Sequence, residues 1–267
     1  MTRGRPMLTP TSLSTSFTPG PATKRITLSA RERTLPVLHT LRRERYSDAV
    51  PYRVLDIPTQ RITHMQQHWE GPVQLPWMKH GRNEGYATLR RRWHAGIVLD
   101  GDWDEATVAF DDYHLARVLH KRFHRGLEWE QIPYIRKALR KVDAGERAWG
   151  GRCRTAADVH ARCAYLDDLH HRLSTQGYRP DRADTGKLTF THFLVNIGRD
   201  GTIIRNNDGK HRILLSRIIG IPTLQARVLV RHRHWQQVRN AIRAGDRTLA
   251  ARFADHPDLA DLADLAP

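Results

Sequence analysis

The sequence predicts an α+β protein in which a small mixed β-sheet carries a largely helical insertion and follows a disordered tail. Three observations support this prediction. Short apolar runs bounded by turn residues occur in the early and late parts of the chain, apolar residues recur at helical spacing between them, and the first 45 residues show neither pattern. We therefore expect a tail at 1–45, a domain at 46–240 with a helical insertion at 105–180, and a C-terminal region at 241–267.

The tail is expected to stay disordered because it cannot bury enough apolar surface to offset the entropy of ordering it. Its stretch "MLTPTSLSTSFTPGPATKR" is rich in Ser, Thr and Pro, and "LRRERY" closes it with basic charge. A basic arm that contacts phosphates is the alternative interpretation.

Five short apolar runs predict the strands. Val54, Leu55 and Ile57 form the first, before a proline, and "IVL" in "HAGIVLDGDWD" forms the second. The turn "GRDG" joins "FLVNI" to "TIIR", so these two runs predict a hairpin. In "LQARVLV" apolar residues alternate, as in a half-buried strand.

The insertion is helical by pattern. In "YHLARVLHKRFH" the apolar residues recur at helical spacing, and "IPYIRKALRKVDAGE" has Pro133 near its start and Gly145 just beyond its end. The next helix has Thr155 as N-cap, Gly177 at its end and one apolar stripe, which predicts a packing role for Cys163.

After the hairpin we expect a helix from His211 to Ile219, stopped by Gly220, and a last helix in "HWQQVRNAIRAGD". The acidic "PDLADLADLAP" is expected to fray.

The net charge of +16, from 44 Lys and Arg against 28 Asp and Glu, favours a polyanionic partner such as a nucleotide or nucleic acid. No stretch has the roughly 20 apolar residues that a membrane-spanning helix needs. With two cysteines and no apolar signal segment, the chain is expected in the cytoplasm.

The turn before the penultimate helix combines features of a phosphate site. Asp208 is a natural N-cap, and Gly209 would let an anion approach the backbone. Lys210 supplies a positive charge, and Arg212 can donate hydrogen bonds to two phosphate oxygens. His211 can donate a hydrogen bond or transfer a proton. A purely structural turn would need the first two residues but not three consecutive cations.

The sequence "DGKHRILLSRIIGIPTLQARVLVRH" resembles the Gly-x-His-Arg core of the ParB/sulfiredoxin superfamily over residues 193–231, and "VLDIPTQRI" resembles its opening strand. The resemblance implies a small mixed sheet whose turn binds nucleotide phosphates through Gly209, His211 and Arg212, with Lys210 at the variable position. Relatives include a nucleotide-gated DNA clamp, a phosphoryl-transferring reductase and small-molecule kinases. The reductase needs a cysteine at the variable position, which excludes that activity. The clamps carry a helix-turn-helix domain after this core, and the 36 residues from His232 to Pro267 are too few for one.

Other side chains are candidates for chemistry. His211 or Asp56 could act in catalysis, the latter as general base or metal ligand if its strand runs beside the turn. Asp102 and Asp104 in "LDGDWDE" could hold magnesium for a nucleoside triphosphate, whereas a calcium loop would need glycine at Glu105. The alternative for this stretch is a solvated turn anchored by Trp103.

We therefore expect binding of a nucleotide or other phosphorylated ligand, with phosphoryl transfer or hydrolysis left open. The alternative is a non-enzymatic DNA-binding protein that uses the tail and the cations of "RVLVRHRHWQQVR". Its contacts would be Arg231, Arg233, Trp235 and Arg239, unless the tryptophan instead seats the last helix on the sheet. The oligomeric state stays open.

Overall fold

The computed structural model describes residues 37, 46–49, 53–66, 96–105, 107–179, 193–206 and 209–263. The expected tail at 1–45 lies outside these residues except for Val37. Helices and a mixed sheet make up the described part, which confirms the α+β class. Within the same ranges, none of the helices combines the length and the apolar content that a membrane crossing requires.

A mixed sheet forms the centre of the fold, and its strands run in the order β1-β7-β5-β6-β2-β4, with β3 also paired to β7. The long β7 pairs antiparallel with β1 through one half of its length and parallel with β3 through the other. β5 and β6 form the expected antiparallel hairpin. The strand bounds are β1 (Val54–Pro58), β2 (Ile62–Gln66), β3 (Ile97–Leu99), β4 (Thr107–Ala109), β5 (Phe193–Ile197), β6 (Ile203–Arg205) and β7 (Thr223–His232).

The helical insertion lies between β4 and β5 in the chain. It contains α3 (His114–Leu119), the π-helical turn η2 (His120–His124), the 3-10 turn η3 (Trp129–Gln131), α4 (Pro133–Asp143) and α5 (Ala156–Gln176). Thr155 caps α5 through a reciprocal pair of hydrogen bonds with Asp158, and Gly177 ends it with φ 68°. The expected range 105–180 also contains β4, because the β-branched Thr107 and Val108 extend the sheet by pairing with β2.

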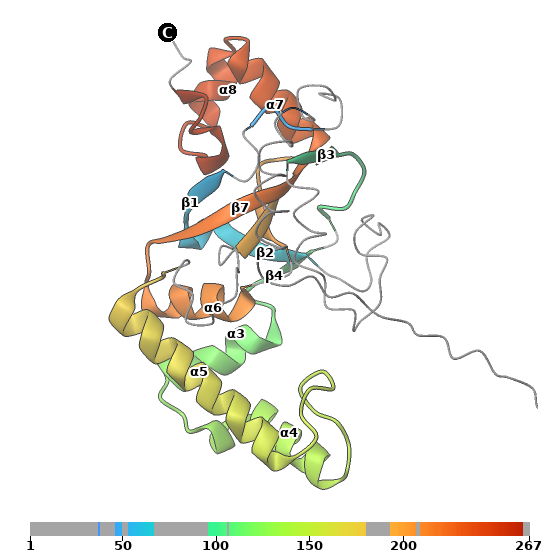
Figure 1. Ribbon diagram of the computed structural model, residues 1–267, viewed down its shortest axis with the longest axis vertical. Helices are drawn as coiled ribbons and strands as arrows, with labels where there is room; N and C mark the ends of the chain where they lie inside the picture. The colour runs from blue at the N-terminus through green and yellow to red at the C-terminus, as the bar shows by residue number, and fades with distance from the viewer. Residues whose placement is uncertain are drawn as a thin grey trace, which may run out of the picture.

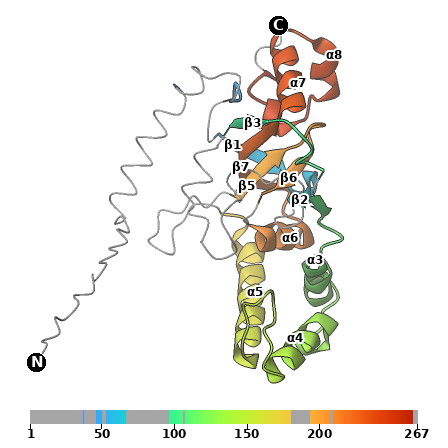
Figure 2. The same ribbon diagram turned by 90° about the vertical axis from the view of Figure 1, so that its right-hand side faces the viewer.

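Two groups of helices pack against opposite ends of the sheet. The helix α6 (Lys210–Ile219) lies between the sheet and the insertion and packs against α5, whereas α7 (Arg233–Arg243) and α8 (Arg247–Arg252) lie at the other end (Figures 1 and 2). A short 3-10 turn, η1 (Thr59–Arg61), joins β1 to β2. One continuous apolar core connects the sheet, α6 and the insertion, and it includes Cys163 in the packing role that its spacing predicted.

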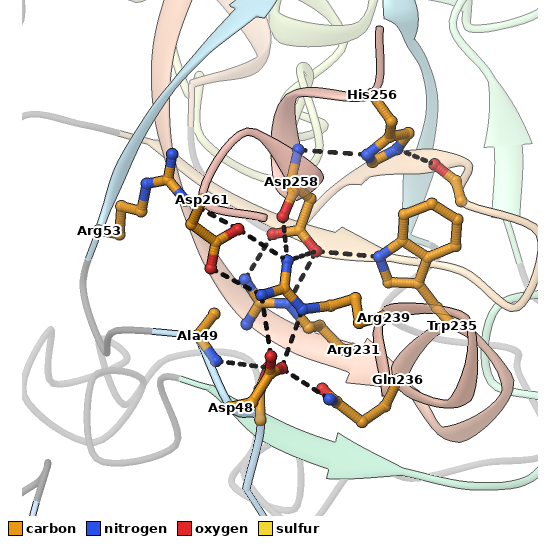
Figure 3. A network of polar contacts seen from close by, with 12 residues as sticks. Asp48, Ala49, Arg53, Arg231, Trp235, Gln236, Arg239, His256, Asp258 and Asp261 are labelled. Atoms are coloured by element: carbon orange, nitrogen blue, oxygen red, sulfur yellow. Dashed lines mark hydrogen bonds and ion pairs between the residues drawn. The ribbon is translucent and has the colours of Figure 1, made fainter. Parts of the chain in front are cut away.

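The C-terminal region does not fray where we expected it to. Through residue 263 it is folded into α8 and the 3-10 turn η4 (Pro257–Leu259), and Asp258 is 1% exposed. The prediction was wrong because the acidic side chains meet buried arginines: Asp258 accepts hydrogen bonds from Arg231, at 2.5 and 2.9 Å, and Asp261 from Arg239, at 2.7 Å (Figure 3). Buried charges of opposite sign that pair in this way hold the segment in place.

Candidate anion-binding site

The turn singled out in the sequence lies where β6 leads into α6. Gly209 is the N-cap residue of this helix, with φ 81°, and the first hydrogen bond of the helix runs from the N–H of Ile213 to its carbonyl. We expected Asp208 to be the N-cap residue. The structure gives that position to Gly209, and Asp208 lies outside the described residues. The first N–H groups of a helix have no acceptor within the helix, and they give this end a partial positive charge.

Gly209 has a packing role that the sequence did not reveal. A Cβ placed on it would lie 2.8 Å from the Cβ of Phe193, closer than side chains tolerate. We expected the missing side chain to leave room for an anion. Instead, the room on that side of the residue is filled by the first residue of β5, and the glycine is needed for this approach and for its left-handed φ.

Lys210 is held by the insertion. Its Nζ donates a hydrogen bond to the hydroxyl of Tyr113, at 3.0 Å, and lies 5.4 Å from the centre of the same ring. Tyr113 is the N-cap residue of α3, so this contact joins the first residue of α6 to the first helix of the insertion. The ammonium group is thereby given a fixed position.

His211 lies in the middle of a cluster of cations. Burial lowers its pKa to about 3, and the charges of Lys210, Arg162, Arg205 and Arg152 act in the same direction. The imidazole is therefore neutral at physiological pH. Its Nε2 is buried and has no hydrogen-bond partner among the described residues.

The cations around His211 come from separate parts of the fold. Arg205 ends β6 and is 5% exposed, Arg162 belongs to α5, and Arg152 is exposed on the loop that precedes α5. The four charges that act most on the imidazole are all positive. Positive charges gathered in this way, together with the positive end of α6, favour an anionic ligand. We call Arg152, Arg162, Arg205 and Lys210, with the neutral His211, the cationic cluster.

Arg212, expected as a phosphate contact, lies against an aromatic ring. Its guanidinium is 6.0 Å from the centre of the Tyr178 ring. Of the five residues expected in the site, the structure brings Lys210 and His211 into the cluster. Sequence reasoning missed Arg152, Arg162 and Arg205; only Arg205 stands near the motif, at the end of "TIIR".

Asp56 is not placed to act as a base at this site. In the register of the sheet, Leu55 pairs with Ala226, which pairs in turn with Phe193. Paired residues share a face of the sheet and neighbours along a strand alternate, so Asp56 lies on the opposite face from the residue that Gly209 contacts. Its side chain is exposed between two buried neighbours.

Asp102 and Asp104 both form ion pairs with Arg199. The Arg199 guanidinium donates to Asp102 at 2.8 Å and to Asp104 at 2.8 Å, and it also pairs with Glu105. Burial by itself raises the pKa of Asp104, but the hydrogen bonds from Arg199 outweigh it and hold that pKa below its usual range. In the described ranges no group of three His, Cys, Asp or Glu side chains is placed to hold a metal. Trp103 is fully buried and anchors this turn, as the alternative interpretation predicted.

Three of the four residues expected at a DNA interface are buried. Arg231 and Arg239 are 4% and 0% exposed, and Trp235 is 0% exposed and donates its indole N–H to Asp258 (Figure 3). The prediction of a basic surface here was wrong because Asp48, Asp258 and Asp261 fold back onto these side chains. Trp235 instead packs α7 onto the fold, in edge contact with Phe253. Only Arg233 stays exposed, where it pairs with Asp100.

Comparison of the chain with protein-family models, with curated proteins and with solved structures found no match.

Proposed function

We propose that this protein binds a nucleotide or another phosphorylated small molecule at the N-terminus of α6. One observation carries the proposal: the buried Nε2 of His211 has no hydrogen-bond partner among the described residues, and the charges that act most on the imidazole are those of four cations. A buried polar atom without a partner costs about 1–3 kcal/mol. A phosphate oxygen would accept a hydrogen bond from this nitrogen and at the same time offset the repulsion among the cations.

Each part of the cluster has a separate role in the proposal. Arg162 offers a planar guanidinium group that can contact two oxygens, while Lys210 acts as a point charge oriented by Tyr113. The N–H groups at the start of α6 add the partial charge of the helix end. Magnesium, where a triphosphate brings it, is held mainly by the phosphate oxygens in this proposal, because Asp102 and Asp104 are engaged by Arg199.

The resemblance of "DGKHRILLSRIIGIP" to the Gly-x-His-Arg core of the ParB/sulfiredoxin superfamily supports the same proposal. The proposal differs in one respect, since it adds Arg152 and Arg162 from the insertion, which the resemblance does not include. We propose binding rather than catalysis, because Asp56 lies on the opposite face of the sheet. We also propose that the protein acts in the cytoplasm, where its buried free thiols, Cys153 and Cys163, stay reduced.

A nucleotide panel tests the proposal directly. Nucleoside triphosphates, diphosphates and inorganic tripolyphosphate, each with and without magnesium, are titrated against the whole chain by calorimetry, and thermal unfolding is measured in parallel. A ligand that binds only the folded state raises the melting temperature. The proposal fails if no phosphorylated compound binds at millimolar concentration or below.

A charge reversal locates the binding. Arg152→Glu should weaken triphosphate binding by about tenfold or more, because it removes one charge-assisted contact and adds a repulsive one. Arg152 is exposed, so its replacement leaves the core intact. Arg154→Glu is the matched control: this arginine is exposed in the same loop but is not among the charges that act most on His211, and its reversal should weaken binding much less than Arg152→Glu does. Equal losses in the two variants would indicate unspecific charge attraction and contradict the proposed site.

A further inference from the structure

Tyr165 is an aromatic side chain that the packing of the fold does not explain. It is 47% exposed, and in the described ranges only one other large hydrophobic residue, Val37, is exposed. The apolar stripe of α5, which includes Cys163 and Leu166, is buried in the core. Tyr165 therefore stands outside that stripe, with about half of its surface open to solvent.

The position of Tyr165 connects it to the cationic cluster. Its ring lies 6.0 Å from the imidazole of His211, at an interplanar angle of 71°. Arg162 precedes it by three residues, which places the two side chains on the same side of α5. Because α5 packs against α6, this exposed aromatic ring lies beside the residues to which we assign phosphate binding.

The neighbouring loop holds the arginines of the cluster in place. Ala148 and Cys153 exchange two backbone hydrogen bonds, at 3.0 and 3.2 Å, so that the loop between them is closed at its base. Trp149 has φ 53°, a left-handed value that among the described residues occurs otherwise only at glycines. Its ring lies 5.3 Å from the Arg162 guanidinium. Such strain persists only where the surroundings over-determine it, so this loop holds Trp149 against Arg162.

We infer that the ligand is a nucleotide whose base stacks on Tyr165 while its phosphates lie among Arg152, Arg162 and Lys210. The inference rests on the proposed function and adds the residue that selects a nucleotide over other phosphorylated ligands. A nucleobase has a flat π face, and stacking on an exposed aromatic ring contributes to affinity with little preference among bases. A sugar phosphate or an inorganic phosphate offers no such face. The pairing of one aromatic platform with a cationic cluster therefore favours nucleotides, and it predicts similar affinity for purine and pyrimidine nucleotides.

The test compares two probes on the same variants. ATP and inorganic tripolyphosphate carry similar charge, but only ATP carries a base. The wild-type chain should bind ATP more tightly, and Tyr165→Ala should weaken ATP binding by about 5- to 100-fold while leaving tripolyphosphate affinity within twofold. Tyr165→Trp should retain ATP binding because it keeps a stacking face. His171→Ala, an exposed residue on a different side of α5, is the control and should change neither affinity.

The outcomes separate the inference from the function on which it rests. If ATP and tripolyphosphate bind equally and Tyr165→Ala affects neither, the inference is overturned while the phosphate site stands. If neither probe binds the wild-type chain, the proposed function fails as well. If Tyr165→Ala weakens both probes by the same factor, the residue supports the site through its contact with His211 and the stacking role is wrong.

Discussion

Gly209 approaches Phe193 so closely that any side chain at this position would overlap the Cβ of the phenylalanine. The contact joins the N-terminus of α6 to the first residue of β5, and Phe193 is itself fully buried. It fixes the direction in which α6 leaves the sheet, and with it the position of Lys210 and His211. The glycine of this motif is therefore a structural requirement of the site.

Gly209→Ala should destabilise the fold for two reasons, the left-handed φ of 81° and the overlap with Phe193. Gly220→Ala is the matched control, because Gly220 has φ 84° but nothing within 4 Å of the added Cβ. We expect the control to cost about 1–2 kcal/mol and Gly209→Ala about 1–3 kcal/mol more, measured by chemical denaturation. Equal losses in the two variants would contradict the close approach.

His211 should make stability depend on pH below neutrality. Its pKa is about 3 in the folded chain, because of burial and the neighbouring cations, against 6.5 for an ordinary histidine. Between these values the unfolded chain binds more protons, so the free energy of unfolding falls as the pH drops below about 6.5. From pH 7 to pH 5, wild type should lose about 1–2 kcal/mol more than His211→Gln. Parallel pH profiles in urea denaturation would contradict this expectation.

Asp258 should be the most sensitive acidic residue of the C-terminal region. It accepts hydrogen bonds from Arg231 and Trp235, and it pairs with Arg239. Asp258→Asn leaves two buried guanidinium groups short of negative charge and should cost about 3–5 kcal/mol.

Asp100→Asn is the matched control for this change. Asp100 is 54% exposed at its side chain and pairs only with the exposed Arg233, so its replacement should change the free energy of unfolding by less than about 0.5 kcal/mol. Denaturation curves that shift equally in both variants would show that the buried pairs contribute no more than a surface pair.

The ionised carboxylate of Asp48 should stabilise the fold, and this stabilisation should be lost at acidic pH. Burial alone raises the pKa of its carboxyl, but hydrogen bonds from Arg239 and Gln236 and the charge of Arg243 outweigh it and hold that pKa well below 3.8. Because the folded pKa is depressed, the contribution is complete above pH 3.8 and is lost as the pH falls below that value. Asp48→Asn should cost about 1–3 kcal/mol at pH 7, and the gap to wild type should close below about pH 4. A gap that stays constant to pH 3 would exclude the ionic contribution.

Local patterns determined most of the secondary structure. The hairpin from Phe193 to Arg205, the Gly220 stop of α6, the alternation in β7 and the buried stripe of α5 all follow from neighbours in sequence, and the structure confirms them. The Lys210–His211 pair was likewise evident from its place at the start of a helix.

Only the tertiary structure decided which charges are buried and which are brought together. The stretch from Arg231 to Arg239 has the composition of a basic surface, yet Asp48, Asp258 and Asp261 enclose it from distant parts of the chain. Likewise Arg162 and Tyr165 come near His211 only because α5 packs against α6. The periodicity of the sequence indicates the face of an element on which a residue lies. Whether two charged groups meet depends on how separate elements pack. Their burial and pairing then determine the free energy of each charge.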